Sequence, residues 1–358
     1  MSRFMNPRYA PLEAYTPGEQ PRDRAYIKLN TNESPYPPSP QVLEAVTWQE
    51  VEDLRLYSDP EGKVLRERLA SYYGLLPDEV FLSNGSDDIL NFAFMAFAGG
   101  DVAAMFPDIT YSFYPVFAQL NGVKVQIVPV KEDFSIDPSD YYQSGSFIVI
   151  TNPNAPTGIA LTREQIRSIV AANPDRVVLI DEAYVDFGAE SAYPLIHEFD
   201  NLLVVMTYSK SRSLAGARLG FALGNRELIA DLNKLKYSTN PYNVNRLTLA
   251  IGCAAVDSAD YFKACCETIA KTREDTAKAL RDMGFTVLPS LANFLFIKKE
   301  GLDGEMLYKT LKERGILIRH FSKEAIRQYN RVTIGTEEEM AAFLQAVKEI
   351  LEEEEGRK

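Results

Sequence analysis

Apolar residues recur along this chain with two different spacings, which indicate helices and strands in turn. The segment 62–74, GKVLRERLASYYG, has apolar residues at helical spacing and ends in a glycine. After it, short apolar runs alternate with amphipathic stretches up to about residue 210. The apolar runs are VFLSNG, VAAMF, KVQIVPV, FIVITNP, VVLIDEAY and LLVVMTYSK; the other stretches include DILNFAFMAFA and TREQIRSIVAA. This alternation predicts a three-layer α/β/α domain with a mostly parallel sheet that is covered on both faces.

A smaller α+β domain is expected to follow from about residue 245. Helical segments continue to about residue 283, and FTVLP, ANFLFIKK, LYKTLKERG, ILIRHF and RVTIGT come after them. The last element begins with Thr336 and Glu339, which have the spacing of a capping box. Residues 1–40 are rich in Pro, Tyr and Asn and predict an extended arm. We therefore divide the chain into an arm (1–40), a large domain (41–244) and a small C-terminal domain (245–358).

Composition narrows the possible partners and chemistry. The chain has 38 Lys and Arg against 50 Asp and Glu, a formal net charge of -12, which argues against binding nucleic acid or an anionic membrane. The N-terminus lacks the apolar core of a secretion signal and no stretch of 18 uncharged apolar residues occurs, so a cytoplasmic protein is expected. Cys253, Cys265 and Cys266 are expected to be reduced packing residues. With only His197 and His320 present, no metal site is expected.

Polar residues follow several of the predicted strands. They stand in SNGSDD (83–88), TNPNAPTG (151–158), DEAY (181–184) and YSK (208–210). Because ligands collect beyond the carboxyl ends of strands in such sheets, these segments are expected to form one pocket. A lysine there can form a Schiff base with an aldehyde, and a carboxylate facing a pyridine nitrogen keeps that nitrogen protonated. The pocket therefore suits pyridoxal 5'-phosphate. Nucleotide-binding and serine-hydrolase motifs are absent from the sequence.

Ten short motifs occur along the chain in the same order as in a known protein family. The chain reads LEAYTPG, LNTNESP, LYSDPEG, SNGSDD, TYSFY, NPNAPTG, DEAYVDF, YSKSRSLAGARLGF, ILIR and RVTIGT. In this order the motifs resemble the pyridoxal-phosphate aminotransferases of fold type I, and most of all the histidinol-phosphate aminotransferases. The resemblance runs over essentially the whole chain. It implies the catalytic and binding roles that follow.

Three residues would act directly on the cofactor. Lys210 would hold it as a Schiff base and, once displaced by substrate, would move the α proton. Asp181 would face the pyridinium nitrogen and raise its proton affinity. Tyr184 would donate its hydroxyl to the phenolate oxygen.

The cofactor phosphate would need donors in a protein of negative net charge. Gly85, Ser86 and Asp87 begin a predicted helix, whose backbone amides can point at an anion. Ser209 would add a hydroxyl and Arg218 a forked cation. The small residues between Lys210 and Arg218 would let the backbone pass closely. The two ends of the cofactor would then be held by one segment of the chain.

Tyr111, Tyr57 and Asn154 complete the cofactor site that the resemblance implies. Tyr111 would stack on the pyridine ring, and Tyr57 would reach the phosphate of a neighbouring subunit, which would require a homodimer. The family commonly shows a second asparagine before PTG that bonds the phenolate oxygen, but this chain has Ala155 there. Either Asn154 substitutes for it or Tyr184 works alone.

In the C-terminal domain, two arginines, Arg319 and Arg331, match those that bind the anionic end of the substrate. Tyr15, Asn32 and Glu33 match positions of the arm that close over the substrate, and Glu33 could meet an imidazole ring. Guanidinium groups suit both phosphate and carboxylate. The implied reaction is reversible amino transfer from L-histidinol phosphate to 2-oxoglutarate, giving imidazole-acetol phosphate and glutamate.

Other activities remain open from the sequence. A threonine-phosphate decarboxylase and an aromatic amino-acid aminotransferase would use a similar fold and cofactor site. A pyridoxal-phosphate sensor is a candidate from another class, but such regulators usually carry a basic DNA-binding extension, which the sequence lacks.

Overall fold

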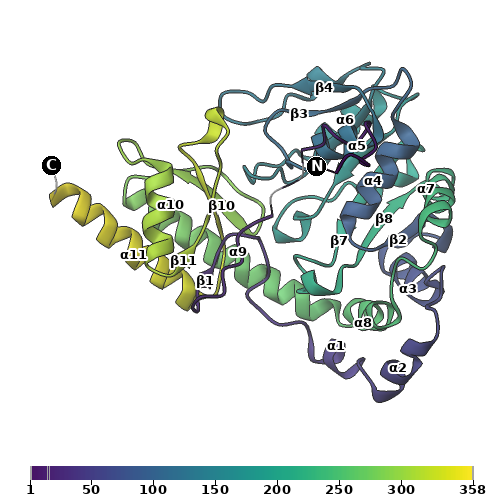
Figure 1. Cartoon of the computed structure of the whole chain (residues 1–358), viewed down its shortest axis with the longest axis horizontal. Helices are drawn as coiled ribbons and strands as arrows, with labels where there is room; N and C mark the ends of the chain where they lie inside the picture. Colours follow the sequence, from purple (N-terminus) through teal and green to yellow (C-terminus); the bar gives the residue numbers. More distant parts are fainter. Residues whose placement is uncertain (1, 14, 16, 357–358) are drawn as a thin grey trace.

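The computed structural model describes residues 2–13, 15 and 17–356. Figure 1 shows a large α/β body and a smaller body that contains the C-terminal helix. The large body has a seven-stranded sheet in the order β2-β8-β7-β6-β5-β3-β4. Its strands are β2 (Val80–Ser83), β3 (Ala104–Pro107), β4 (Val125–Val128), β5 (Phe147–Thr151), β6 (Val178–Asp181), β7 (Leu202–Thr207) and β8 (Gly220–Gly224).

The sheet is mostly parallel, as predicted. Strands β7, β6, β5, β3 and β4 pair in parallel, whereas β8 runs antiparallel to both β7 and β2. Strand β2 therefore points the same way as the parallel strands. The ends of β2, β5, β6 and β7 consequently lie at one edge of the sheet, as the polar segments that follow them require.

Helices cover both faces of this sheet because successive strand residues point to opposite sides. Ile148 and Ile150 enter one core, whereas Phe147 and Val149 enter the other. The first core includes residues of α3 (Lys63–Tyr73), α6 (Arg163–Ala171) and α8 (Arg246–Asp257). The second includes residues of α4 (Ser86–Phe97), α5 (Tyr114–Asn121) and α7 (Arg226–Thr239). The three-layer architecture is thus confirmed.

The smaller body has its own core and a four-stranded antiparallel sheet in the order β12-β13-β10-β9. Its elements are α9 (Ala259–Asp282), β9 (Thr286–Val287), β10 (Phe294–Lys298), α10 (Gly304–Glu313), β11 (Ile316–Leu317), β12 (Arg319–His320), β13 (Asn330–Thr333) and α11 (Glu337–Gly356). The predicted capping box precedes α11: Glu339 N donates to Thr336 Oγ1 at 3.2 Å, and Thr336 N donates to Glu339 Oε2 at 2.9 Å.

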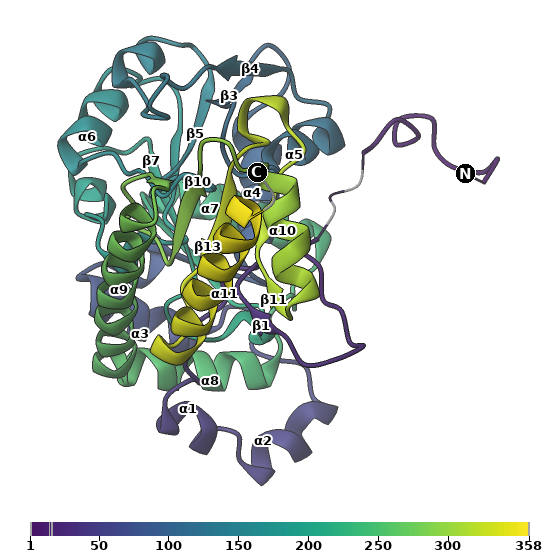
Figure 2. The same cartoon turned by 90° about the vertical axis from the view of Figure 1, so that its left-hand side faces the viewer.

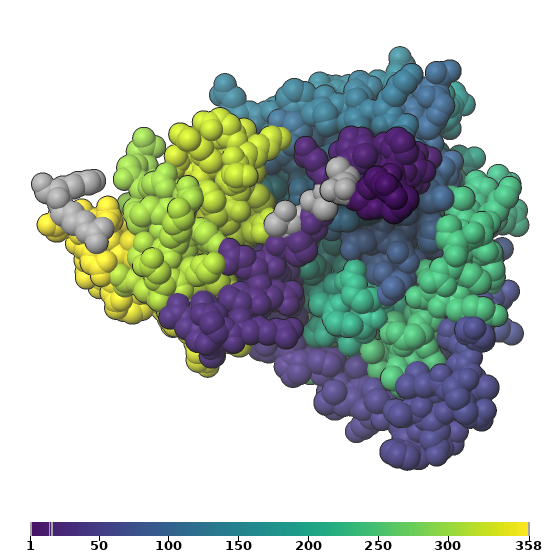
Figure 3. All heavy atoms as spheres, viewed as in Figure 1, coloured from purple at the N-terminus to yellow at the C-terminus, as the bar shows by residue number. Residues whose placement is uncertain are grey.

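The N-terminal segment runs along both bodies. Strand β1 (Ile27–Lys28) pairs in parallel with β11, and Arg8 donates from Nη2 to Leu120 O at the end of α5. In Figure 3 the purple residues lie across the face between the yellow-green C-terminal body and the blue-green large body. Beyond this segment, α1 (Pro40–Glu44) and α2 (Trp48–Glu52) project from one end of the molecule (Figures 1 and 2).

Short 3₁₀ turns connect these elements: η1 (Asp53–Arg55), η2 (Pro77–Glu79), η3 (Pro138–Tyr141), η4 (Val185–Phe187), η5 (Tyr193–His197), η6 (Ala215–Ala217) and η7 (Glu324–Ile326). Within the described residues, no helix combines the length and apolar character needed to cross a bilayer.

Candidate active site

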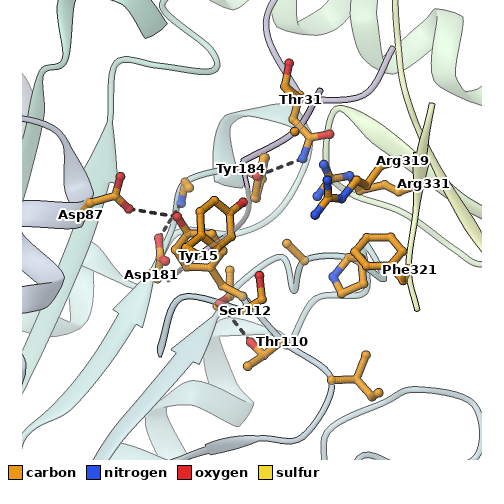
Figure 4. A pocket seen from close by; sticks show the side chains of 18 of the residues that line it. Tyr15, Thr31, Asp87, Thr110, Ser112, Asp181, Tyr184, Arg319, Phe321 and Arg331 are labelled. Atoms are coloured by element: carbon orange, nitrogen blue, oxygen red, sulfur yellow. Dashed lines mark hydrogen bonds between the residues drawn. The ribbon is translucent and has the colours of Figure 1, made fainter. Parts of the chain in front are cut away.

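A cavity of about 620 Å³ lies where residues of the strand ends, the N-terminal segment and the smaller body meet. Figure 4 shows Asp87 and Asp181 on one side of it, two arginines on the other, and Tyr184 between them. The structure brings these predicted residues together in its lining: Tyr15, Asn32, Ser86, Asp87, Tyr111, Asp181, Tyr184, Ser209, Lys210, Arg218, Arg319 and Arg331. Gly85, Asn154, Glu33 and Tyr57 are outside the lining.

Lys210 follows β7 and points into the cavity. Its Nζ donates to the backbone oxygen of Thr31 at 3.1 Å and lies 5.9 Å from the centre of the Tyr184 ring. Burial lowers the pKa of the Lys210 amine to about 8, and the charge of Arg331 adds to this effect. An amine with a lowered pKa supplies more of its neutral, nucleophilic form near neutral pH.

Asp181 ends β6 and is buried, with 3% of its surface exposed. Its Oδ2 accepts from Tyr114 Oη at 2.9 Å, and its Oδ1 accepts from Ala183 N at 3.3 Å. Burial raises the pKa of Asp181 to about 6. No cation in the described part of the chain forms an ion pair with this carboxyl group. A buried carboxylate without a cation fits a ligand that brings its own positive charge, such as a protonated pyridine nitrogen.

Tyr184 follows Asp181 closely and is also buried. Its ring packs edge-on against Phe294, with centroids 5.1 Å apart, and its hydroxyl accepts a hydrogen bond from Asn32 Nδ2 at 3.0 Å. Burial raises the pKa of Tyr184, so its hydroxyl keeps its hydrogen and can donate it at neutral pH.

The start of α4 is packed closely against Arg218 and β8, and this packing makes it suitable for binding an anion. Gly85 is its N-cap residue, with φ 84°, and an added Cβ there would lie 2.7 Å from Arg218 Nη2. An added Cβ on Gly220 would lie 2.5 Å from Ser86 N. Glycine at both positions therefore lets β8 and Arg218 approach the exposed amides of the first helical turn.

Arg218 adds a cation to this site. It has left-handed backbone geometry, with φ 53°, and its Nη1 donates to Ser209 Oγ at 3.4 Å. Its Nη2 pairs with Asp87 Oδ2 at 3.1 Å, and Asp87 Oδ1 accepts from Tyr111 Oη at 3.0 Å. Backbone amides, a hydroxyl and a guanidinium group thus surround a space suited to phosphate. The predicted donors fit the cofactor.

Both amide hydrogens of Asn154 bond other groups of the protein. Its Nδ2 donates to Ile109 O at 2.9 Å and to Thr157 Oγ1 at 3.1 Å, and its Oδ1 has no hydrogen-bond partner in the part of the chain that the structure describes. Ala155, by contrast, lines the cavity. The amide hydrogens of Asn154 therefore bond the segments that follow β3 and β5, and Ala155 places a methyl group in the cavity wall.

Two arginines stand side by side on the small-domain side of the cavity. Arg319 and Arg331 are cross-strand partners in β12 and β13. Arg331 donates from Nη2 to Asn30 O at 2.9 Å, and its buried Nε has no hydrogen-bond partner among the described residues. Burial lowers the pKa of Arg331, and Arg319 adds to this effect. Neither forms an ion pair with a carboxylate of the described residues, so together they offer a site for an anionic ligand.

The remaining predicted residues occupy different places. Tyr15 lines the cavity and packs edge-on against Phe113 at 4.9 Å. Glu33 instead forms a close ion pair with Lys28. Tyr57 is 81% exposed and stacks on Tyr242 at 4.5 Å, away from the cavity lining of its own chain.

Sequence reasoning missed several residues that position this site. Tyr114 bonds Asp181 and Thr151 Oγ1, the latter at 2.6 Å, although the sequence pointed only to Tyr111 of the same motif. Asp186 accepts from Ser211 Oγ at 2.5 Å and from Arg212 Nη1 at 3.1 Å. This contact ties the segment after Lys210 to the segment after Tyr184. The only signal in the sequence was the position of these residues within the quoted motifs.

Comparisons with known proteins agree with this geometry. A model of the family described as "Aminotransferase class I and II" matches residues 24–347. The chain is 49% identical over 352 residues to a histidinol-phosphate aminotransferase of Brachyspira hyodysenteriae, covering 98% of this chain and 99% of that protein. It is 51% identical over 351 residues to one from Marinomonas sp., covering 97% and 99%.

A solved structure supports the same fold. The histidinol-phosphate aminotransferase of Sinorhizobium meliloti, in complex with pyridoxal 5'-phosphate, superposes with a TM-score of 0.82 at 24% identity, covering 91% of this chain and 92% of that one. Enzymes of this kind depend on pyridoxal phosphate. From the family match and these relatives, the chain belongs to the class I and II aminotransferases and, within them, to the histidinol-phosphate aminotransferase family.

Proposed function

We propose that this chain transfers the amino group of L-histidinol phosphate to 2-oxoglutarate, giving imidazole-acetol phosphate and glutamate. The observation that carries the substrate assignment is the pair Arg319 and Arg331, which line the cavity and form no ion pair with a carboxylate in residues 2–13, 15 and 17–356. One pair of guanidinium groups can bind the phosphate of the first substrate and a carboxylate of the second. The names of relatives about half identical over nearly the whole chain support the same assignment.

Different residues around the cavity would bind different parts of the cofactor. The amides of Ser86 and Asp87, with Ser209 and Arg218, would hold the cofactor phosphate, while Asp181 would face the ring nitrogen. When bound, pyridoxal phosphate supplies an aldehyde that condenses with amines and a ring that accepts electrons from a breaking C–H bond. Lys210 would bind that aldehyde at rest. During turnover its Nζ would remove the proton from the amine-bearing carbon of the substrate.

Lys210 is the direct test of this arrangement. We expect Lys210→Ala to abolish the reducible Schiff base and to lower amino transfer by several orders of magnitude, because both the covalent anchor and the proton carrier are lost. Lys278→Ala, which removes an exposed lysine of α9, is the matched control and should keep full activity. Turnover by Lys210→Ala would contradict the catalytic assignment.

A substrate panel tests the reaction itself. The purified protein with pyridoxal phosphate is given histidinol phosphate plus 2-oxoglutarate, then threonine phosphate alone, then phenylalanine plus 2-oxoglutarate. Glutamate should form fastest with the first mixture. Release of carbon dioxide from threonine phosphate, or faster glutamate formation with phenylalanine, would overturn the proposed substrate in favour of a decarboxylase or an aromatic aminotransferase.

We also propose that the active enzyme is a homodimer in which Tyr57 serves the neighbouring subunit. Tyr57 is highly exposed and lies outside the cavity of its own chain. Large apolar side chains are exposed on the same part of the chain: Leu43, Val46, Trp48, Val51, Leu54, Leu56, Val64 and Leu76. A second copy of the chain would bury them, as expected for an apolar surface of this kind.

A further inference from the structure

Ala155 places a methyl group in the cavity wall, in the same apolar cluster as Tyr184, and so leaves a gap in the hydrogen-bond donors that line the cavity. Asn154 cannot fill this gap with its amide hydrogens, because they are bonded to Ile109 O and Thr157 Oγ1. Tyr184 is then left to supply a hydrogen bond to the cofactor oxygen. A phenolic hydroxyl has one hydrogen and can turn it in more than one direction. The question is what fixes that hydrogen.

Asn32 is the neighbour that contacts this hydroxyl. It lines the cavity, is 1% exposed, and has left-handed backbone geometry with φ 58°. Its backbone nitrogen donates to Thr333 Oγ1 at 3.0 Å, and its backbone oxygen accepts from Asn293 Nδ2 at 3.0 Å. Asparagine tolerates this conformation better than most residues, and Thr333 of β13 and Asn293, which precedes β10, hold its backbone.

The amide orientation follows from the same bonds. Thr333 Oγ1 accepts from Asn32 N, so its single hydrogen is available for Asn32 Oδ1, at 2.9 Å. Asn32 Nδ2 therefore faces Tyr184 Oη, at 3.0 Å, and can only donate. If the Asn32 amide were flipped, Nδ2 would face Thr333 Oγ1, and the hydroxyl hydrogen of Thr333 would no longer have Asn32 Oδ1 as its acceptor. The hydroxyl of Tyr184 accepts from Asn32 and keeps its own hydrogen for the cavity.

We propose that Asn32 is a positioning residue that directs the hydrogen of Tyr184 toward the cofactor oxygen, and so replaces the amide that is missing at Ala155. This inference rests on the proposed function, since it needs pyridoxal phosphate in the cavity. It also changes the expected role of Asn32, which the sequence suggested as a substrate contact. Asn32 acts through Tyr184, and only Tyr184 would contact the cofactor.

The experiment follows the bound cofactor and does not depend on turnover. A hydrogen bond to the phenolate oxygen stabilises negative charge there, so its loss should raise the pH at which the absorption of the bound cofactor changes. We expect Asn32→Gly to raise this midpoint by about one pH unit and to weaken cofactor binding about fivefold, since one hydrogen bond of the site is lost. Glycine suits the positive φ, so the backbone remains unstrained.

A double-mutant cycle tests whether Asn32 acts on the cofactor through Tyr184 or by a separate structural effect. Tyr184→Phe should raise the midpoint by itself, and adding Asn32→Gly should then change nothing further, because Asn32 would act only through Tyr184. Adding Ala155→Asn to Asn32→Gly should restore part of the shift. Asn32→Asp, which keeps the size but can only accept, should shift the midpoint at least as far and serves if the glycine variant folds poorly.

The possible results are distinct. Additive effects of Asn32→Gly and Tyr184→Phe, or no shift in Asn32→Gly, would overturn the inference. A wild-type protein without cofactor absorption would overturn the proposed function instead, before any variant is compared.

Discussion

At the scale of single residues, burial sets the chemistry of the cavity. It lowers the pKa of Lys210 to about 8 and raises that of Asp181 to about 6, because a charged group is less stable away from water. The pKa of each group therefore lies within about one unit of neutral pH, where the group can gain or lose a proton. Groups with such shifts are typical of active sites.

Arg331 offers a prediction at this scale. Arg331→Lys keeps the positive charge but loses the fork of donors, so we expect KM for histidinol phosphate to rise about tenfold, the equivalent of about 1.4 kcal/mol, with little change in kcat. Steady-state kinetics measures this. Arg327→Lys, an exposed arginine that pairs with Glu324, is the control and should leave KM unchanged. An unchanged KM in Arg331→Lys would mean that Arg331 does not bind the substrate anion.

Glu182 gives a prediction about pH. Its carboxyl is buried, accepts from Ala192 N at 2.6 Å and from the Ser191 hydroxyl, and burial raises its pKa to about 8 from an ordinary value of 4.5. The unfolded chain therefore loses this proton first as the pH rises. The stabilising contribution of Glu182 is full below about pH 4.5 and is lost by about pH 8.

Urea unfolding of the cofactor-free protein at pH 5, 6, 7 and 8 tests this. We expect the wild type to lose free energy of unfolding over this range relative to Glu182→Gln, which stays neutral and can keep both hydrogen bonds. Glu132→Gln, at an exposed position, should run parallel to the wild type. Parallel curves for the wild type and Glu182→Gln would contradict the raised pKa.

At the scale of elements, strand ends and helix starts place the reactive groups. Asp181 ends β6, Lys210 follows β7, and α4 begins after β2. Because β8 is antiparallel, its first residues lie beside the end of β2, with Gly220 opposite Ser83. This register brings Arg218 to the start of α4. The anion site therefore depends on one antiparallel strand within a mostly parallel sheet.

The capping box of α11 gives a prediction for a single element. Thr336→Ala removes the oxygen that accepts from Glu339 N, so we expect a loss of about 1 kcal/mol in the free energy of unfolding. Thermal and urea unfolding measure this. Thr268→Ala is the control, since Thr268 lies within α9 and its hydroxyl bonds Ala264 O of the same helix. Equal stability of Thr336→Ala and the wild type would show that the cap contributes little.

At the scale of the whole molecule, the cavity is made by both bodies and the N-terminal segment together. A cluster of Ile109 with Phe296, Ile326 and Tyr329 joins the large body to the small one at its rim. Lys323 adds a bond from Nζ to Asp108 O at 2.6 Å. The substrate arginines therefore reach the cofactor residues only when the two bodies pack in this way.

The proposed dimer gives the prediction at this scale. Leu54→Asp places a charge in the exposed apolar surface near Tyr57, so we expect it to convert a dimer to a monomer with weakened cofactor binding and reduced activity. Sedimentation velocity and cofactor titration measure both effects. Val125→Asp, an exposed apolar position on β4, should remain dimeric. A wild-type protein that is fully active as a monomer would refute the shared site.

Sequence patterns alone determined the architecture and the edge of the sheet at which the pocket lies. Arg218 and most of the other cavity residues were expected from the resemblance to a known family. The alternation of apolar runs and amphipathic stretches predicted the covered parallel sheet, and polar residues after the strands predicted that Lys210 and Asp181 would meet in one pocket. These predictions succeeded because they rest on local features: apolar periodicity, helix-start signals and the fixed direction of parallel strands.

Only the tertiary structure decided which side chains touch. Asn32 bonds Tyr184, 152 residues away, and Thr333, 301 residues away. Tyr114 bonds Asp181 across 67 residues, whereas Glu33 turns to Lys28. Hydrogen bonds depend on a few tenths of an ångström and on the angle between groups. That precision comes from the packing of whole elements against one another, which the residues near each position in the sequence do not encode.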